Sequence, residues 1–235
     1  MPYNSNITYL NYLKKSGVSF FLQDKPRIYY DIQISKYVIK DISDVKNLNE
    51  LRLFIKQINN TELTKNSPEP IIGEGNDKAK IMLIGEFVEK KENQELKSIS
   101  EEPEKLLNKM LKAIKLNRDE VYTTNIIPWP VIKKKKINNK DLLSCLPFIQ
   151  RQIEIIKPNI ILLMGTIAAN AILNTNLDIN TLRGKWHTYN SINLSRPIDC
   201  LITYHPKNLI DFPKNKKDAW ADLQIFQKKI KDEIS

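Results

Sequence analysis

The sequence is short of cysteine and of long apolar runs. Its two cysteines, Cys145 and Cys200, are too few for a disulfide framework or for a metal site built from cysteine thiolates. No apolar run approaches the roughly 18 residues that a membrane span requires. No basic start followed by an apolar stretch is found at Met1, so no signal peptide is expected. These absences predict a cytoplasmic protein.

Negative charge is scarce relative to positive charge. Lysine and arginine number 37 against 27 aspartate and glutamate residues, which gives a formal net charge of +10. Such an excess favours an anionic partner, nucleic acid first. The chain is also heavy in Lys, Asn and Ile, a bias that AT-rich coding produces in any protein, so the charge is only modest support.

The chain of 235 residues is long enough for one domain with an appendage, or for two small domains. We expect an N-terminal extension over residues 1–45 and a main domain over residues 46–235. In the main domain, apolar runs of strand length alternate with helical stripes. Strands are expected at 80–86, 120–125, 159–165 and 200–205, and helices at 47–58, 106–114, 142–156, 166–173 and 219–230. This alternation predicts an α/β fold, a doubly wound three-layer α/β/α arrangement with a central four-stranded parallel sheet.

Four residues fall just past the carboxyl ends of the expected strands: Glu86, Asn125, Gly165 and His205. Because parallel strands end at one edge of a sheet, these residues should converge on one crevice. Pro206 disfavours helix at His205, which is therefore expected to be extended or in a turn. We further expect Asn125 and His205 to lie on neighbouring strands and to face each other across a gap.

Each of these residues also has a structural interpretation. Glu86 could be an exposed loop carboxylate, Asn125 could cap a turn, and His205 could bond a nearby carbonyl. Gly165 could simply let the next helix start close to the sheet.

Two basic segments are candidates for binding a nucleic-acid backbone. The run Lys133, Lys134, Lys135 and Lys136 is either a solvated loop or a backbone contact. Arg183 and Lys185 belong to the segment 183–187, which reads as a simple hairpin or as a basic and aromatic loop beside the site.

Several segments, taken in order, resemble the family 4 uracil-DNA glycosylases of the uracil-DNA glycosylase superfamily, over roughly residues 46–230. The segments are Gly75-Asn76, Leu83-Ile84-Gly85-Glu86, Val121-Tyr122-Thr123-Thr124-Asn125, Leu162-Leu163-Met164-Gly165-Thr166-Ile167-Ala168-Ala169 and Thr203-Tyr204-His205-Pro206. Leu182-Arg183-Gly184-Lys185-Trp186 and Ala219-Trp220-Ala221-Asp222-Leu223 resemble the bacterial members.

The resemblance implies roles for the strand-end residues. A glycosylase flips its target nucleotide out of the duplex and reads the base in a pocket. Asn125 would bind N3–H and O4 of uracil, and His205 would act catalytically as the donor to O2, where negative charge develops. Glu86 would help to place water at the sugar as the second catalytic residue. The backbone at Gly85 would contact the base.

The chain departs from the family's pattern after Glu86. The family reads Gly-Glu-Ala-Pro-Gly or Gly-Glu-Gly-Pro-Gly, whereas this chain has Gly85-Glu86-Phe87-Val88-Glu89. Phe87 is therefore expected at the substrate pocket in place of a small residue, and Glu89 would repel a nearby phosphate. Ile99 falls where the family has a phenylalanine that stacks on uracil, a stacking worth about 1–3 kcal/mol.

The family's iron–sulfur cluster is expected to be absent. Four cysteine thiolates normally hold such a cluster. The matching positions here lie in the region 58–62 and at Trp129 and Cys145, of which only Cys145 is a cysteine. We interpret Cys145 as a buried core residue.

Two functions stay open from the sequence. The first is an active uracil-DNA glycosylase, which hydrolyses the N-glycosidic bond of a flipped-out deoxyuridine in base excision repair. The second is a catalytically weak or inactive glycosylase-fold protein that binds DNA as a repair accessory. In both cases the expected partner is DNA, uracil-containing for the enzyme, and the protein is expected to be a monomer.

Overall fold

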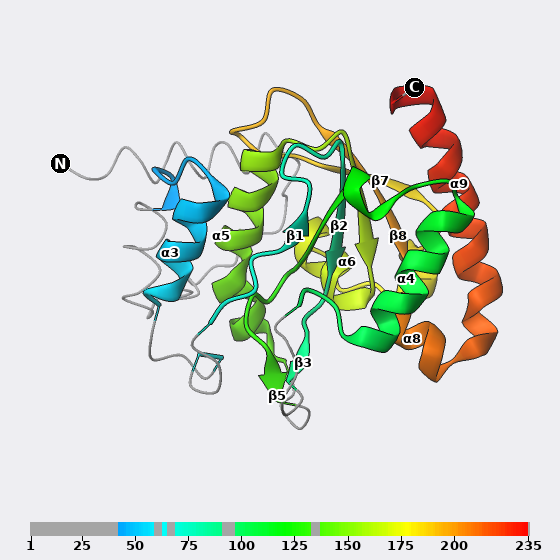
Figure 1. Cartoon of the computed structure of the whole chain (residues 1–235), viewed down its shortest axis with the longest axis horizontal. Coiled ribbons are helices and arrows are strands. Elements are labelled where there is room, and N and C mark those ends of the chain that lie inside the picture. The colour runs from blue at the N-terminus through cyan, green and yellow to red at the C-terminus, as the bar shows by residue number, and fades with distance from the viewer. Residues whose placement is uncertain (1–41, 59–62, 65–68, 91–96, 133–136, 235) are drawn as a thin grey trace, which may run out of the picture. The chain divides into compact units, whose positions relative to one another are not determined.

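A six-stranded sheet forms the centre of the main domain, in the order β1-β4-β2-β6-β8-β7 (Figure 1). The computed structural model describes residues 42–58, 63–64, 69–90, 97–132 and 137–234. The four central strands are mutually parallel, whereas β1 and β7 are antiparallel edges. The strands are β1 (Glu74–Gly75), β2 (Ile81–Gly85), β4 (Val121–Asn125), β6 (Ile160–Met164), β7 (Trp186–Tyr189) and β8 (Ile198–Thr203). The predicted four-stranded parallel sheet is confirmed, and the two edge strands extend it.

Helices cover both faces of this sheet (Figure 1). One face carries α3 (Leu48–Lys56), α5 (Asn139–Ile156) and α6 (Thr166–Leu173), and the other carries α4 (Glu101–Ala113), α8 (Pro206–Asp211) and α9 (Lys216–Ile234). The shorter elements are β3 (Glu89–Lys90) paired with β5 (Val131–Ile132), η1 (Arg118–Glu120), α7 (Ile179–Leu182) and η2 (Pro213–Asn215). The doubly wound α/β/α prediction is therefore confirmed.

Three of the four central strands are buried throughout, because both of their faces are covered. Every residue of β2, β4 and β6 is buried. Such continuous apolar strands are typical of parallel sheets. On the side of α4 and α9, the core includes Leu83, Leu107, Leu162 and Phe226. A rigid, close-packed sheet of this kind fixes the positions of the residues that follow its strands.

The boundaries of the long helix α5 follow from local chemistry. Asn138 and Asp141 form a reciprocal capping box at its start. The helix ends at Lys157, which adopts the left-handed conformation with φ 53°. None of the helices in the described part of the chain combines the length and the apolar composition needed to cross a bilayer.

The described residues belong to one compact unit. The predicted extension over residues 1–45 lies almost entirely outside the described residues, so its boundary stays a prediction.

Candidate functional site

The carboxyl edge of the sheet brings together the side chains predicted from strand ends. Asn125 ends β4, Glu86 follows β2, and His205 follows β8. The expectation that Asn125 and His205 lie on neighbouring strands is wrong, because β2 and β6 separate β4 from β8. Both side chains nevertheless reach the backbone of Gly85. A β-carbon added to Gly85 would lie under 3.0 Å from Asn125 Oδ1 and 3.4 Å from His205 Nε2.

Asn125 presents a buried hydrogen-bond acceptor at this point. The residue is 2% exposed, and its Nδ2 donates to the carbonyl oxygen of Ser98 at 2.6 Å. That bond orients the amide, so its oxygen Oδ1 is directed toward Gly85 and has no hydrogen-bond partner among the described residues. A buried acceptor left unpaired costs about 1–3 kcal/mol. A ligand that donates an N–H would remove this cost.

His205 presents a donor next to that acceptor. Its backbone is extended, with φ −65° and ψ 140°, as the proline at 206 predicted. The ring nitrogen Nδ1 accepts the backbone N–H of Lys207 at 3.2 Å, which assigns the proton of the neutral ring to Nε2. Burial lowers the pKa of His205 to about 4, and the charge of Lys207 contributes to the same shift. At neutral pH, Nε2–H of an uncharged imidazole therefore lies beside the backbone of Gly85.

Glu86 is held at the start of helix α6. Its Oε1 accepts the backbone N–H of Ile167 at 2.9 Å. Gly165 makes this approach possible, since its φ is +100° and a β-carbon there would lie under 3.0 Å from Oε1. Burial raises the pKa of Glu86, while the Ile167 amide, the charge of Lys207 and the Thr166 amide lower it. Glu86 is thus a partly buried carboxyl that caps a helix, rather than a freely solvated loop carboxylate.

A cavity of about 270 Å³ opens beside Glu86 and His205. Gly165, Tyr204 and Lys207 also line it. Its volume lies just below the range of about 300–1,000 Å³ found for small-molecule sites. Asn125, Phe87 and Ile99 do not line this cavity, so it adjoins the acceptor and donor pair at Gly85 from the side of β8.

Lys207 was not predicted from the sequence, although it follows His205 by only two residues. Its Nζ lies 2.5 Å from Glu89 Oε1. Glu89 was expected to repel a phosphate, but its carboxylate is paired with this ammonium group. The pair is partly exposed, with 45% of the Lys207 side chain and 23% of the Glu89 side chain accessible.

The two predicted apolar pocket residues lie in different environments. Phe87 is partly buried directly after Glu86. Ile99 is 2% exposed and belongs to the hydrophobic core with Leu107 and Leu111. In this arrangement Ile99 packs as a core side chain.

The basic residues predicted to contact DNA are only partly described. Lys133, Lys134, Lys135 and Lys136 lie outside the described residues. Arg183 binds the Asp222 carboxylate with two nitrogens, at 2.7 and 3.1 Å. Lys185 is exposed and donates to the Thr181 carbonyl oxygen at 3.0 Å. Arg183 is therefore engaged inside the protein, whereas Lys185 stays accessible.

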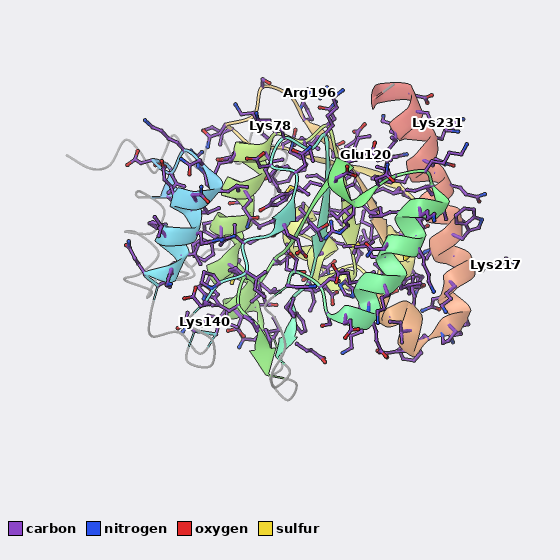
Figure 2. All side chains as sticks on the ribbon, in the orientation of Figure 1. Lys78, Glu120, Lys140, Arg196, Lys217 and Lys231 are labelled. Atoms are coloured by element: carbon purple, nitrogen blue, oxygen red, sulfur yellow. The ribbon has the colours of Figure 1, made fainter. Side chains whose placement is uncertain are left out.

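The basic residues that Figure 2 labels lie at both ends of the molecule rather than at one edge. Lys140 lies at the start of α5, near the carboxyl edge, while Lys78, Arg196 and Lys231 lie toward the opposite end of the molecule. The net charge by itself therefore does not mark the site.

The residues present do not fit the iron–sulfur cluster that the resemblance implies. Cys145 is fully buried on α5, and the other cysteine, Cys200, lies on β8. Trp129 is 2% exposed and packs edge-on against Phe148, with ring centroids 5.9 Å apart. Among the described residues, no group of three or more His, Cys, Asp or Glu side chains is placed to hold a metal ion. Aromatic packing occupies the region around Trp129.

Comparison with known proteins gives a consistent result. The family model described as the uracil DNA glycosylase superfamily matches residues 72–224. The chain is 29% identical over 194 residues to a type-4 uracil-DNA glycosylase of Saccharolobus solfataricus, which covers 80% of this chain and 87% of that protein. It is 28% identical over 182 residues to that of Archaeoglobus fulgidus, with 77% and 92% covered. It is 33% identical over 157 residues to that of Sulfurisphaera tokodaii, with 65% and 70% covered.

Proposed function

Because the chain belongs to the uracil-DNA glycosylase superfamily, we propose that it is a uracil-DNA glycosylase that hydrolyses the N-glycosidic bond of a flipped-out deoxyuridine. The observation that carries this proposal is the pair of side-chain atoms above Gly85. Asn125 Oδ1 is a buried acceptor without a partner among the described residues, and His205 Nε2 is a donor beside it. A base that donates and accepts at adjacent ring positions would satisfy both.

Uracil has this pattern at its N3–H donor and at the acceptor O2, the carbonyl oxygen on the neighbouring ring carbon. Its N3–H would donate to Asn125 Oδ1, and its O2 would accept from His205 Nε2. Cytosine has an unprotonated N3, which would place a second acceptor against Asn125 Oδ1. Leaving that buried oxygen unpaired is the physical basis for rejecting cytosine.

Bond cleavage supports the same assignment of roles. As the glycosidic bond breaks, the departing base gains negative charge that is shared by its oxygens. A neutral imidazole at O2 donates a stronger hydrogen bond to that charge than to the ground-state carbonyl. His205 is suited to this role because burial keeps its ring uncharged at neutral pH. Glu86, on the cavity side of His205, is the carboxyl that would place the attacking water.

The remaining contacts follow from the same pose. The Gly85 backbone and Phe87 would border the base, and Ile99 would support the pocket from the core. Lys185 and the run 133–136 are the proposed contacts to the DNA backbone, whereas the Arg183 guanidinium is bound by the Asp222 carboxylate. We place the protein in the cytoplasm as a monomer that excises uracil in repair without an iron–sulfur cluster.

A cleavage assay with oligonucleotides that contain a single uracil, in single and double strands, tests the proposal. We expect Asn125→Ala and His205→Ala each to lower kcat about 10²–10³-fold, the effect of losing one preorganised donor or acceptor. His187→Ala is the matched control, because His187 is the other histidine and its Nε2 lies 3.1 Å from the Leu182 carbonyl oxygen, away from Gly85. Wild-type protein that binds these oligonucleotides and leaves every uracil intact would reject the proposal.

A further inference from the structure

A buried carboxylate contacts the end of β8, two residues before His205. Asp222, on α9, is 1% exposed. Burial raises its pKa, while the hydrogen bond from Thr203 and the charge of Arg183 lower it. A buried charge is costly unless it is fully paired, so the groups that pair it are of interest.

Two residues donate hydrogen bonds to the Asp222 carboxylate. Thr203, the last residue of β8, donates its hydroxyl to Oδ2 at 2.8 Å. Arg183 donates through Nε to Oδ2 at 3.1 Å and through Nη2 to Oδ1 at 2.7 Å. Gly184 has φ +67°, and a β-carbon there would lie 2.8 Å from Oδ1, so a glycine is needed for this approach. The carboxylate thereby ties α9 to the end of β8.

The same network holds the residue between Thr203 and His205. The Arg183 guanidinium lies over the Tyr204 ring, 5.4 Å from its centroid. The Tyr204 hydroxyl donates to Asn180 Oδ1 at 2.6 Å. Thr203 and Tyr204 are thus each fixed by side-chain contacts, and His205 is the next residue along the chain.

We propose that Asp222 is a positioning residue for His205, acting through Thr203 and Arg183 to fix the end of β8 so that Nε2 faces Gly85. This inference rests on the proposed glycosylase function for its effect on rate, but the position of the ring can be measured without catalysis. In this scheme Arg183 binds Asp222 and Tyr204 inside the protein and does not contact DNA.

The rate test uses Asp222→Asn and Thr203→Val, each in the wild-type and His205→Ala backgrounds. We expect kcat to fall about 10–100-fold with KM for DNA unchanged, since small misplacements of a reacting group are costly. In the His205→Ala background neither change should lower kcat further. Thr203→Ser keeps the hydroxyl and should retain activity. Equal losses in both backgrounds, or no loss in either, would overturn the inference.

The positional test is independent of activity. The chain has two histidines, so His187→Ala assigns both imidazole signals in a nitrogen-correlated NMR spectrum. Thr203→Val should shift or broaden the His205 signal and leave that of His187 in place. Asp218→Asn is the matched control, because Asp218 lies on the same helix, is 53% exposed and lies 4.0 Å from Arg183. An unchanged His205 signal in Thr203→Val would overturn the inference, and a wild-type protein without glycosylase activity would reject only the proposed function.

Discussion

Replacing Gly165 by alanine should disturb both the fold and the carboxyl of the site. Gly165 has φ +100° and ψ 167°, a conformation that costs an L-residue about 1–3 kcal/mol. The new β-carbon would lie under 3.0 Å from Glu86 Oε1, so the carboxylate must leave the Ile167 amide. Loss of such a cap costs about 0.5–2 kcal/mol. The unfolding free energy should therefore fall by roughly 1.5–5 kcal/mol in total.

Urea denaturation of four proteins separates these two contributions. The set is wild type, Gly165→Ala, Glu86→Ala and the double variant. In the Glu86→Ala background the cap is already lost, so Gly165→Ala should cost less there, by about 0.5–2 kcal/mol. Uracil release by Gly165→Ala should fall toward the level of Glu86→Ala, because the same carboxyl is displaced. A Gly165→Ala protein within about 0.5 kcal/mol of wild type would refute the reasoning.

Three further predictions concern pH, charge and iron. Burial lowers the pKa of His205 from 6.5 to about 4, so the unfolded state binds more protons between these values. The unfolding free energy, measured by urea titration, should therefore decline as pH falls from 6.5 to 4. His205→Gln should make this decline smaller. An unchanged dependence of the unfolding free energy on pH in His205→Gln would contradict the burial of the ring. Glu89→Gln frees the Lys207 ammonium group to contact a phosphate. DNA binding measured by fluorescence anisotropy should therefore tighten, and the slope of log affinity against log salt concentration should steepen by about 0.9. Weaker binding would contradict this. Purified protein should contain no stoichiometric iron and keep its activity after chelation; loss of activity on iron removal would contradict the packing seen at Cys145.

The central sheet could be predicted because its strands are continuous apolar runs between helical stripes. The segments Ile81–Gly85 and Ile160–Met164 are apolar at nearly every position. This sequence pattern is typical of strands that are covered on both faces. The edge strand Glu74–Gly75 has only two residues and no apolar pattern, so nothing in the sequence marked it. The sequence predicts the strand Trp186–Tyr189 only as part of a possible hairpin. Short edge strands depend on their neighbour for definition rather than on their own composition.

The site could be predicted only as far as parallel topology determines it. Strand ends meet at one edge whatever the strand order, so the convergence of Asn125 and His205 followed from their positions in sequence. The order itself was not encoded in any pattern, which is why the expectation of neighbouring strands failed. Contacts between residues far apart in the sequence could not be predicted either. Glu86 accepts from an amide 81 residues away, and Arg183 binds a carboxylate 39 residues away.

The charges around the site bear on how DNA would be drawn to it. Lys207 is the cation beside the cavity, and it is already paired with Glu89, while Glu86 and Asp211 add carboxyl groups to the lining. Among the described residues that line the cavity, Lys207 is the one lysine or arginine, so they form no concentrated positive patch, although the whole chain carries a net charge of +10. We expect attraction of DNA to come from the proposed backbone contacts, Lys185 and the run 133–136, and from other surface cations such as Lys140, which Figure 2 labels. Such a distribution predicts that salt weakens binding strongly but changes the rate of bound substrate little, because base recognition uses the neutral amide and imidazole at Gly85.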